Sequence, residues 1–175
     1  LACRNQGVVL FAAVLVLISH GGYAMEFTFE EQPGHLDLLG TGKVWLRTLT
    51  MAYDANNKEE TYKVYTHIYD FEGDSPITKG PGGKYSHHRG LFIGWKDTLV
   101  PEGDSVRDLD TWHMENCYQE HAAWLEKKVG PEQAVQVEEI LWKTEKHEPF
   151  IREIRRITAQ EKPDGLRILD FQSTL

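Results

Sequence analysis

The stretch that decides the fold is IREIRRITAQEKPDGLRILDFQSTL, residues 151–175, in which a turn signal separates two apolar patterns. Residues 162–165 read KPDG, where proline presets one turn dihedral and aspartate and glycine tolerate the conformations of a tight turn. The run after it alternates between two faces, as a half-buried strand does. A hairpin needs a second strand before the turn, which outweighs the helical spacing of Ile151, Ile154 and Ile157.

Short alternating runs separated by turn signals fill most of the remaining chain. Strand patterns lie at residues 26–31, 43–53, 62–71 and 91–95, and the polar or glycine-rich stretches 54–60, 72–76, 79–84 and 101–110 are expected to be loops. Two longer runs, YQEHAAWLEKKVG and AVQVEEILWKTEKH, fit helix or strand, because Ala, Glu, Leu and Lys favour helices. We expect an all-β fold, an antiparallel β-sandwich.

The domain boundaries follow from the two ends of the chain. Residues 1–24 hold one base, Arg4, then an apolar run over residues 8–18 and small residues up to Ala24, which is typical of a signal peptide. That run is shorter than the roughly 20 residues that span a membrane, so an uncleaved anchor is the second interpretation. The pattern predicts a secreted or periplasmic protein. Residues 25–175 form one domain, expected to be incomplete because its last strand pattern stops at the chain end.

Composition excludes some classes of partner. The chain has 175 residues and a net charge of −8, and charges of both signs are mixed along it. Such a surface lacks the basic footprint of a nucleic-acid-binding protein, and an anionic membrane would repel it. Without the leader, Cys117 is the one cysteine left, so we expect no internal disulfide and a buried, inert thiol.

The most reactive-looking stretch is KYSHHRGLFIGW, residues 84–95. His87 and His88 are candidate proton-transfer groups, and Arg89 is a candidate clamp for hydroxyls or carboxylates. In an extended chain, neighbouring side chains point to opposite faces, so His87 would share a face with Arg89 and only one histidine would meet a pocket. The alternative is a polar loop in which these side chains make structural hydrogen bonds.

Other polar and aromatic side chains extend this candidate site. The candidate ligand contacts are His67, Trp112, His113 and His121. Trp112 has polar neighbours, as sugar-stacking aromatics do, although a core position is equally consistent with the sequence. Trp95, Trp124 and Trp142 lie in apolar runs and are expected in the core. No histidine spacing matches a metal-ligand signature, so no metal residue is assigned and the cofactor stays undefined.

Together these motifs resemble a family of secreted bacterial proteins of unknown function that is often labelled PmoA or methane oxygenase PmoA. The resemblance runs from about residue 62 to 175 and is carried by HHRG at residues 87–90, by His67 and Trp112, and by the final LDFQSTL. The chain departs from the family pattern where Tyr85-Ser86 replaces a proline. The oxygenase label implies a membrane protein, yet no run after the leader approaches 20 apolar residues.

HHRG is also similar, over a shorter length, to the strand entry of aldose-epimerase-like proteins, which are large mutarotase-like β-sandwiches. That resemblance implies histidine acid–base chemistry on sugar hydroxyls. The expected function is a secreted carbohydrate-active protein that hydrolyses or epimerises a sugar derivative, with a small-molecule or carbohydrate ligand. A non-catalytic carbohydrate-binding module and a histidine-ligated metal protein are the alternatives, so the sequence leaves open whether the protein is an enzyme.

Overall fold

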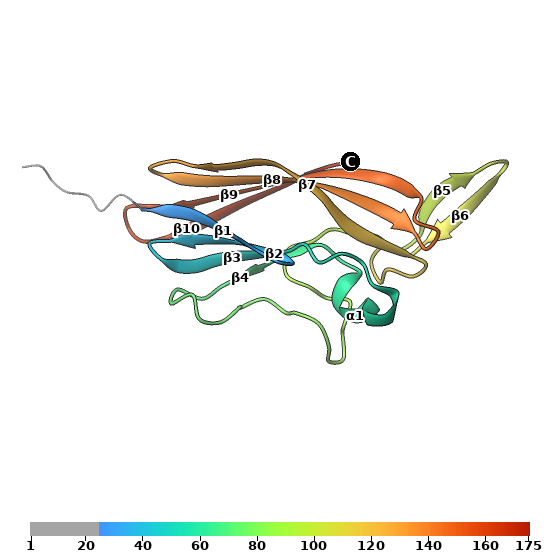
Figure 1. The fold of residues 1–175 in the computed structure, drawn as a ribbon, viewed down its shortest axis with the longest axis horizontal. Helices are drawn as coiled ribbons and strands as arrows, with labels where there is room; N and C mark the ends of the chain where they lie inside the picture. Colours follow the sequence, from blue (N-terminus) through green and yellow to red (C-terminus); the bar gives the residue numbers. More distant parts are fainter. Residues whose placement is uncertain (1–24) are drawn as a thin grey trace, which may run out of the picture.

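The computed structural model describes residues 25–175 as two antiparallel sheets stacked face to face (Figure 1). The predicted signal peptide, residues 1–24, lies outside the described residues. The first sheet has the order β1-β2-β3-β4, and the second has the order β10-β9-β8-β7. The expectation of an all-β, antiparallel sandwich is therefore confirmed.

The strands of the first sheet are β1 (Phe27–Gln32), β2 (His35–Gly40), β3 (Lys43–Leu49) and β4 (Tyr65–Ile68). Those of the second are β7 (Cys117–Val129), β8 (Gln133–Thr144), β9 (Pro149–Glu161) and β10 (Arg167–Thr174). A separate hairpin joins β5 (Thr98–Glu102) to β6 (Ser105–Leu109). Between β3 and β4 lie a short 3-10 helix, η1 (Ala55–Asn57), and the single-turn helix α1 (Lys58–Thr61).

The KPDG turn forms the predicted hairpin between β9 and β10. The Lys162 N–H donates to the Leu166 carbonyl over 2.9 Å, and Gly165 takes a φ of 83°, a left-handed conformation that glycine adopts without a steric cost. Both ambiguous runs are strands, β7 and β8. On β9, every second residue from Glu153 to Ala159 is buried against the first sheet, so the helical face through Ile151, Ile154 and Ile157 does not exist.

Apolar side chains from both sheets fill the interior at the end of the sandwich that holds the KPDG turn. Phe27 meets Trp45 edge to face, with ring centroids 5.1 Å apart, and this pair packs on Ile157 and Ala159 of β9. Beyond this cluster a buried polar contact crosses the sheets, where the Gln136 amide donates to the Thr48 hydroxyl over 2.7 Å. Further along the sandwich, Val64, Ile140 and Trp142 form a second apolar cluster.

Three local predictions are wrong. Residues 101–110, expected to be a loop, supply most of the β5–β6 hairpin, which projects from one end of the sandwich (Figure 1). Residues 54–60 are helical rather than a simple turn. Residues 91–95 are not a strand, because Leu91 makes only an isolated bridge to Thr66 and the backbone then runs irregularly.

The predictions of core positions are confirmed for some residues and wrong for others. Trp142 is fully buried, as predicted, whereas Trp95 stacks on it at 5.8 Å with its outer face open to solvent, so its assignment to the core is wrong. Trp124 is half-buried on β7. Cys117 is buried as predicted, and burial raises the pKa of its thiol to about 12, which keeps it protonated and unreactive.

Candidate functional site

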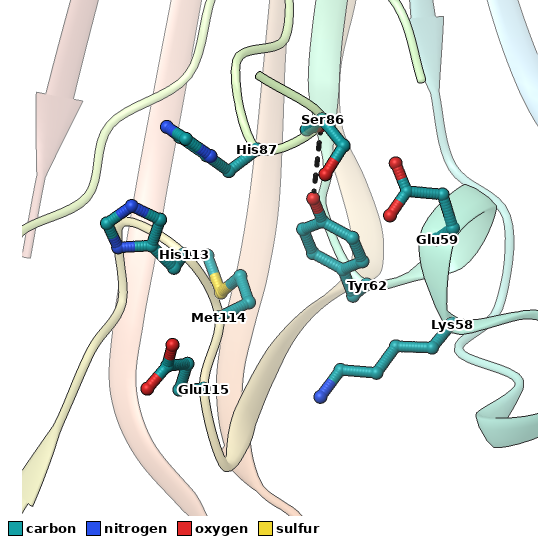
Figure 2. Close-up of a pocket in the computed structure, with 8 residues that line it drawn as sticks. All are labelled: Lys58, Glu59, Tyr62, Ser86, His87, His113, Met114 and Glu115. Atoms are coloured by element: carbon teal, nitrogen blue, oxygen red, sulfur yellow. Dashed lines mark hydrogen bonds between the residues drawn. The ribbon is translucent and has the colours of Figure 1, made fainter. Parts of the chain in front are cut away.

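Two loops meet beside α1 and border an open cavity of about 430 Å³ (Figure 2). One loop connects β4 to β5 and carries HHRG, and the other connects β6 to β7 and carries DTWHME. The cavity is lined by Lys58, Glu59, Tyr62, Ser86, His87, His113, Met114 and Glu115. Sequence segments about 25 residues apart in the chain therefore contribute their histidines to one place.

An aspartate and a histidine form a hydrogen-bonded pair at the cavity wall. The His113 Nδ1 lies 2.7 Å from Asp110 Oδ2, and the His113 backbone N–H donates to Asp110 Oδ1 over 2.8 Å. Burial alone would raise the pKa of Asp110, but these hydrogen bonds from His113 outweigh burial and lower it. Asp110 is therefore a carboxylate, and its contact fixes both the orientation of the His113 ring and the nitrogen that carries its proton.

A second imidazole lies against this pair. The His87 and His113 ring centroids are 4.2 Å apart, and Figure 2 shows both rings on the same side of the cavity. Burial, followed by the positive influence of His113, His88 and Lys63, lowers the pKa of His87, so this ring is neutral at lower pH than an ordinary imidazole. Among the described residues, His87 has no ring hydrogen bond and His113 has none beyond Asp110, so His87 and the Nε2 atom of His113 remain open to a ligand.

His88 and Trp112 form the aromatic surroundings of this histidine pair. The His87 and His88 rings are 4.4 Å apart, and His88 stacks on Tyr85 at 5.4 Å. Trp112 lies 5.8 Å from His88 and 6.3 Å from His87. Opposite faces for His87 and His88 would require an extended segment; residues 84–87 form a turn instead, so both rings stay close together and that part of the prediction is wrong.

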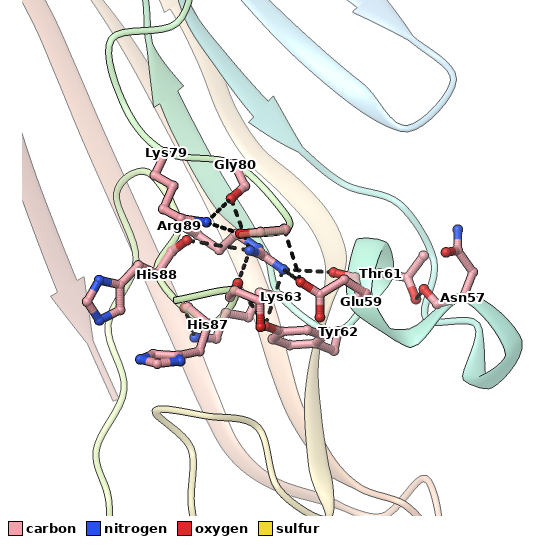
Figure 3. A network of polar contacts seen from close by, with 12 residues as sticks. Asn57, Glu59, Thr61, Tyr62, Lys63, Lys79, Gly80, His87, His88 and Arg89 are labelled. Atoms are coloured by element: carbon pink, nitrogen blue, oxygen red, sulfur yellow. Dashed lines mark hydrogen bonds and ion pairs between the residues drawn. The ribbon is translucent and has the colours of Figure 1, made fainter. Parts of the chain in front are cut away.

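The guanidinium of Arg89 is buried and points towards Glu59 of α1 and Tyr62 (Figure 3). Its terminal nitrogens donate to the carbonyls of Ser86, Gly80 and, over 2.8 Å, Glu59, and one also reaches the Tyr62 hydroxyl. The side chain of Arg89 is 1% exposed. The structure thus gives Arg89 the task of tying the HHRG loop to α1, and its predicted contact with a ligand stays a prediction.

Lys63 hydrogen-bonds the backbone of both loops that border the cavity. Its Nζ donates to the carbonyl of His87 over 2.7 Å and to that of Trp112 over 2.5 Å, one from each loop, and lies 3.8 Å from the Phe92 ring centroid. Burial, reinforced by the charge of Arg89, lowers the pKa of Lys63 to about 7. Lys63 therefore couples the backbone that carries His87 to the backbone that carries His113.

Gly90 fixes the path of the HHRG loop into the sheet. The Leu91 N–H donates to the Thr66 carbonyl over 2.8 Å and the Thr66 N–H donates back over 3.1 Å. A Cβ atom on Gly90 would collide with the same Thr66 carbonyl, so only glycine allows this approach. Within HHRG, Arg89 and Gly90 therefore anchor the loop, whereas the imidazole rings of His87 and His88 are accessible.

Two predicted ligand residues lie elsewhere. His67 hydrogen-bonds Thr78 at 3.0 Å and packs beside Gly80, and burial, with Arg47 next, lowers its pKa. His121 Nδ1 lies 3.1 Å from Glu138, a buried carboxylate of β8. Of the seven predicted site residues, His87 and His113 line the cavity, and His88 and Trp112 pack beside them, whereas His67 and His121 lie elsewhere.

Sequence reasoning did not assign roles to Asp110 or Lys63. The spacing of Asp110 and His113, three residues apart in a segment with turn-forming residues, was the available signal for the first. Lys63 interrupts the alternation of YKVYTH without any motif, and only the tertiary structure reveals its contacts. Within residues 25–175, no group of three or more His, Cys, Asp or Glu side chains has an arrangement that could hold a metal ion.

Comparison with known proteins places the chain in a family without giving it an activity. Residues 41–175 match the model of a family of unknown function, DUF6807. No curated protein and no solved structure matches the chain. Across residues 25–175, no helix has the length and apolar character needed to cross a membrane.

Proposed function

We propose, from the premise that this chain belongs to the DUF6807 family of unknown function, that it is a carbohydrate-active protein whose chemistry is proton transfer at Asp110, His113 and His87. The observation that carries this proposal is the pair formed by His113 and Asp110, with Nδ1 and Oδ2 2.7 Å apart and the His87 ring against it. A histidine oriented by a carboxylate and open at its other nitrogen is the arrangement used for general acid–base catalysis.

The hydrogen bond assigns the proton on His113. Because the Asp110 carboxylate accepts, Nδ1 carries the hydrogen and Nε2 keeps its lone pair. That lone pair can take a proton from a hydroxyl group in the cavity, and the nearby carboxylate stabilises the imidazolium that results. His113 is thus the proposed general base.

His87 supplies the second half of the transfer. Its ring lies 4.2 Å from that of His113, and burial, followed by the positive influence of His113, His88 and Lys63, lowers its pKa. At the ring edges that face the cavity, the anomeric hydroxyl of a sugar would give its proton to His113 while a protonated His87 gives one to the ring oxygen, so that the ring opens and the anomers exchange. For hydrolysis, His113 would take its proton from a water that attacks the anomeric carbon, and His87 would protonate the glycosidic oxygen as its bond to that carbon breaks.

The aromatic surface beside the histidines supports a sugar as the ligand. Trp112 is half-buried behind the cavity-lining residues, with its ring 6.3 Å from His87 and 5.8 Å from His88, and this aromatic side chain would back the apolar side of a sugar whose hydroxyls meet the imidazoles. The similarity of HHRG to aldose-epimerase-like proteins and the expected secretion agree with this assignment. The methane oxygenase label is not part of the proposal.

The test compares His113→Ala and Asp110→Asn with His35→Ala, a matched histidine removal on β2 away from the cavity. Free aldoses and methyl glycosides are followed by ¹H NMR for anomer exchange and by mass spectrometry for cleavage. We expect wild type and His35→Ala to turn over at least one sugar, His113→Ala to lose about 10²–10⁴-fold in rate and Asp110→Asn to lose less. Saturable binding without turnover in wild type would instead support the carbohydrate-binding module, and full activity in His113→Ala would overturn the assignment.

A further inference from the structure

We infer that Tyr85 and His88 form a second sugar-binding subsite beside the cavity, so that the ligand is an oligosaccharide whose neighbouring unit packs on this pair of stacked rings. This inference rests on the proposed function and adds the length of the ligand to it. Its starting point is two exposed rings of the HHRG loop that the proton-transfer scheme does not use.

Tyr85 is an exposed aromatic residue whose ring is held in one orientation. The residue is 49% exposed, and its ring stacks on that of His88 with centroids 5.4 Å apart and an interplanar angle of 17°. His88 in turn meets Trp112 at 5.8 Å, and Trp112 meets Phe92 at 5.1 Å. The Tyr85 ring is therefore the outer end of a column of rings, whereas an isolated exposed side chain changes rotamer freely.

The backbone beneath the two stacked rings is held by buried side chains (Figure 3). Tyr85 and His88 are the first and last residues of a turn, which is closed by the His88 N–H donating to the Tyr85 carbonyl over 3.1 Å. The carbonyls of the two residues between them accept hydrogen bonds from Arg89, Tyr62 and Lys63. These anchors position the turn without the Tyr85 ring, so the rings are free to serve a ligand. A preformed site of this kind loses little conformational entropy on binding.

The two stacked rings have the mixed polarity that suits a sugar. An aromatic face packs on the apolar side of a pyranose ring, and a phenol or imidazole edge hydrogen-bonds to its hydroxyls. Within residues 25–175, neither the Tyr85 hydroxyl nor the ring nitrogens of His88 have a hydrogen-bond partner. The Lys84 Nζ lies 5.2 Å from the Tyr85 ring centroid, and this exposed side chain can move aside or donate to a sugar hydroxyl.

The stacked rings are contiguous with the cavity. Ser86 and His87, which lie between Tyr85 and His88 in the turn, both line the cavity. The His87 ring centroid is 4.4 Å from that of His88 and 6.3 Å from that of Tyr85. With one sugar unit at His87 and His113, the next unit of the same chain is placed to reach the stacked rings. A monosaccharide occupies only one of the two places.

The experiment begins with a glycan array of mono-, di- and oligosaccharides that is probed with the full chain. Isothermal titration calorimetry then compares the oligosaccharide that binds most tightly with its own terminal monosaccharide. We expect the oligosaccharide to bind about tenfold more tightly, because only it reaches Tyr85, and Tyr85→Ala to remove most of this gain. Tyr85→Phe should keep most of it, because the ring face remains.

Phe71→Ala is the matched control. It removes a ring that is 64% exposed on the loop after β4, where the Phe71 carbonyl accepts a hydrogen bond from Arg167 of β10. The affinity of this variant for both sugars should equal that of wild type. Equal weakening of oligosaccharide binding by Phe71→Ala and Tyr85→Ala would assign the loss to a general effect and overturn the subsite.

Affinity and turnover separate this inference from the proposed function. Equal affinity of wild type for the oligosaccharide and the monosaccharide, or undiminished oligosaccharide binding by Tyr85→Ala, overturns the subsite and leaves proton transfer at His113 standing. A gain that depends on Tyr85, in a protein that turns over none of the glycans it binds, supports the subsite and overturns the proton-transfer proposal. Binding to no glycan on the array overturns both.

Discussion

Two buried basic side chains, Arg155 between the sheets and Lys63 beside the cavity, have opposite kinds of surroundings. Arg155 is 1% exposed, yet its guanidinium has Glu153 at 2.8 Å and Glu138 at 3.8 Å, and it donates to the Val64 carbonyl of the facing sheet. Lys63 is 4% exposed and has carbonyls and an aromatic ring but no carboxylate.

The difference separates a structural region from a site that is open to a ligand. Around Arg155 the protein supplies its own counter-ions, and Glu153 also accepts from Trp142 and Ser173, whereas Glu138 Oε1 is buried without a hydrogen-bond partner. Around Lys63 the carboxylates of Asp110 and Glu59 act only from beyond hydrogen-bond distance, and burial lowers the pKa of Lys63 to about 7. Four predictions test this difference between Arg155 and Lys63, and the one with the largest effect comes first.

Removing the guanidinium of Arg155 should cost the most. In Arg155→Met two buried carboxylates lose their partner, which we expect to lower the free energy of unfolding by about 3–5 kcal/mol. Urea unfolding measures the loss. Arg152→Met on the same strand is the control, because its side chain is 61% exposed and pairs with Glu139 at the surface, which is worth less than about 1 kcal/mol. Equal losses of unfolding free energy in the two variants would contradict the view that Arg155 compensates the buried carboxylates.

Removing the ammonium of Lys63 should cost less. Lys63→Met leaves the His87 and Trp112 carbonyls unpaired, but it also removes a buried basic group and places an apolar chain against Phe92. We expect a net loss of about 1–2 kcal/mol by urea unfolding, below that of Arg155→Met. A loss as large as that of Arg155→Met would show that Lys63 is as fully compensated as the core arginine, and the contrast would fail.

The stability of the protein should depend on pH through Lys63. Its pKa is about 7 in the folded protein and near 10.5 in the unfolded chain, so between these values the unfolded chain binds more protons and stability rises with pH. The stabilisation is complete above about pH 10.5 and is lost as pH falls towards 7. Urea unfolding between pH 7 and 9 should show a rise of at most about 1.4 kcal/mol per pH unit in wild type that is absent in Lys63→Met. A rise of the same size in the variant would assign it to other groups.

The smallest effect concerns the imidazole of His87. Its pKa should lie below 6.5, and Lys63→Met should raise it, because one of the charges that disfavours the imidazolium is gone. A ¹H–¹⁵N NMR titration follows the ring directly. Lys127→Met is the control, since it removes an equal charge ten residues along β7 from Cys117. A pKa of His87 that moves equally in both variants would show that the field of Lys63 does not reach the cavity.

Periodicity and turn chemistry were enough to predict most of the sandwich. The KPDG turn and the alternation after it predicted β9 and β10, and the hairpin resolved the helical spacing of the preceding isoleucines in favour of a strand. The β5–β6 hairpin was missed because it projects from the sandwich, so that Leu99 and Val106 are exposed and only Val100 and Leu109 pack on the core.

The site was only half predictable, for a physical reason. His87, His88, Trp112 and His113 could be chosen by chemistry, but their meeting depends on two loops whose paths are set by Arg89, Gly90 and Lys63. Treating residues 84–89 as extended led to the wrong expectation for His87 and His88. Local sequence does not reveal such loop anchors, because their partners are backbone carbonyls of distant segments.

The most direct test of the proton-transfer site is the protonation state of the His113 ring. Long-range ¹H–¹⁵N NMR of the wild-type protein at pH 8 should show His113 with hydrogen on Nδ1 and a bare Nε2, and Asp110→Asn should abolish this preference. Addition of the substrate or ligand found in the sugar screen should shift the Nε2 signal of His113 and the ring of His87, and leave His35 unchanged. A His113 protonated on Nε2, or rings that do not respond to a bound sugar, would contradict the account.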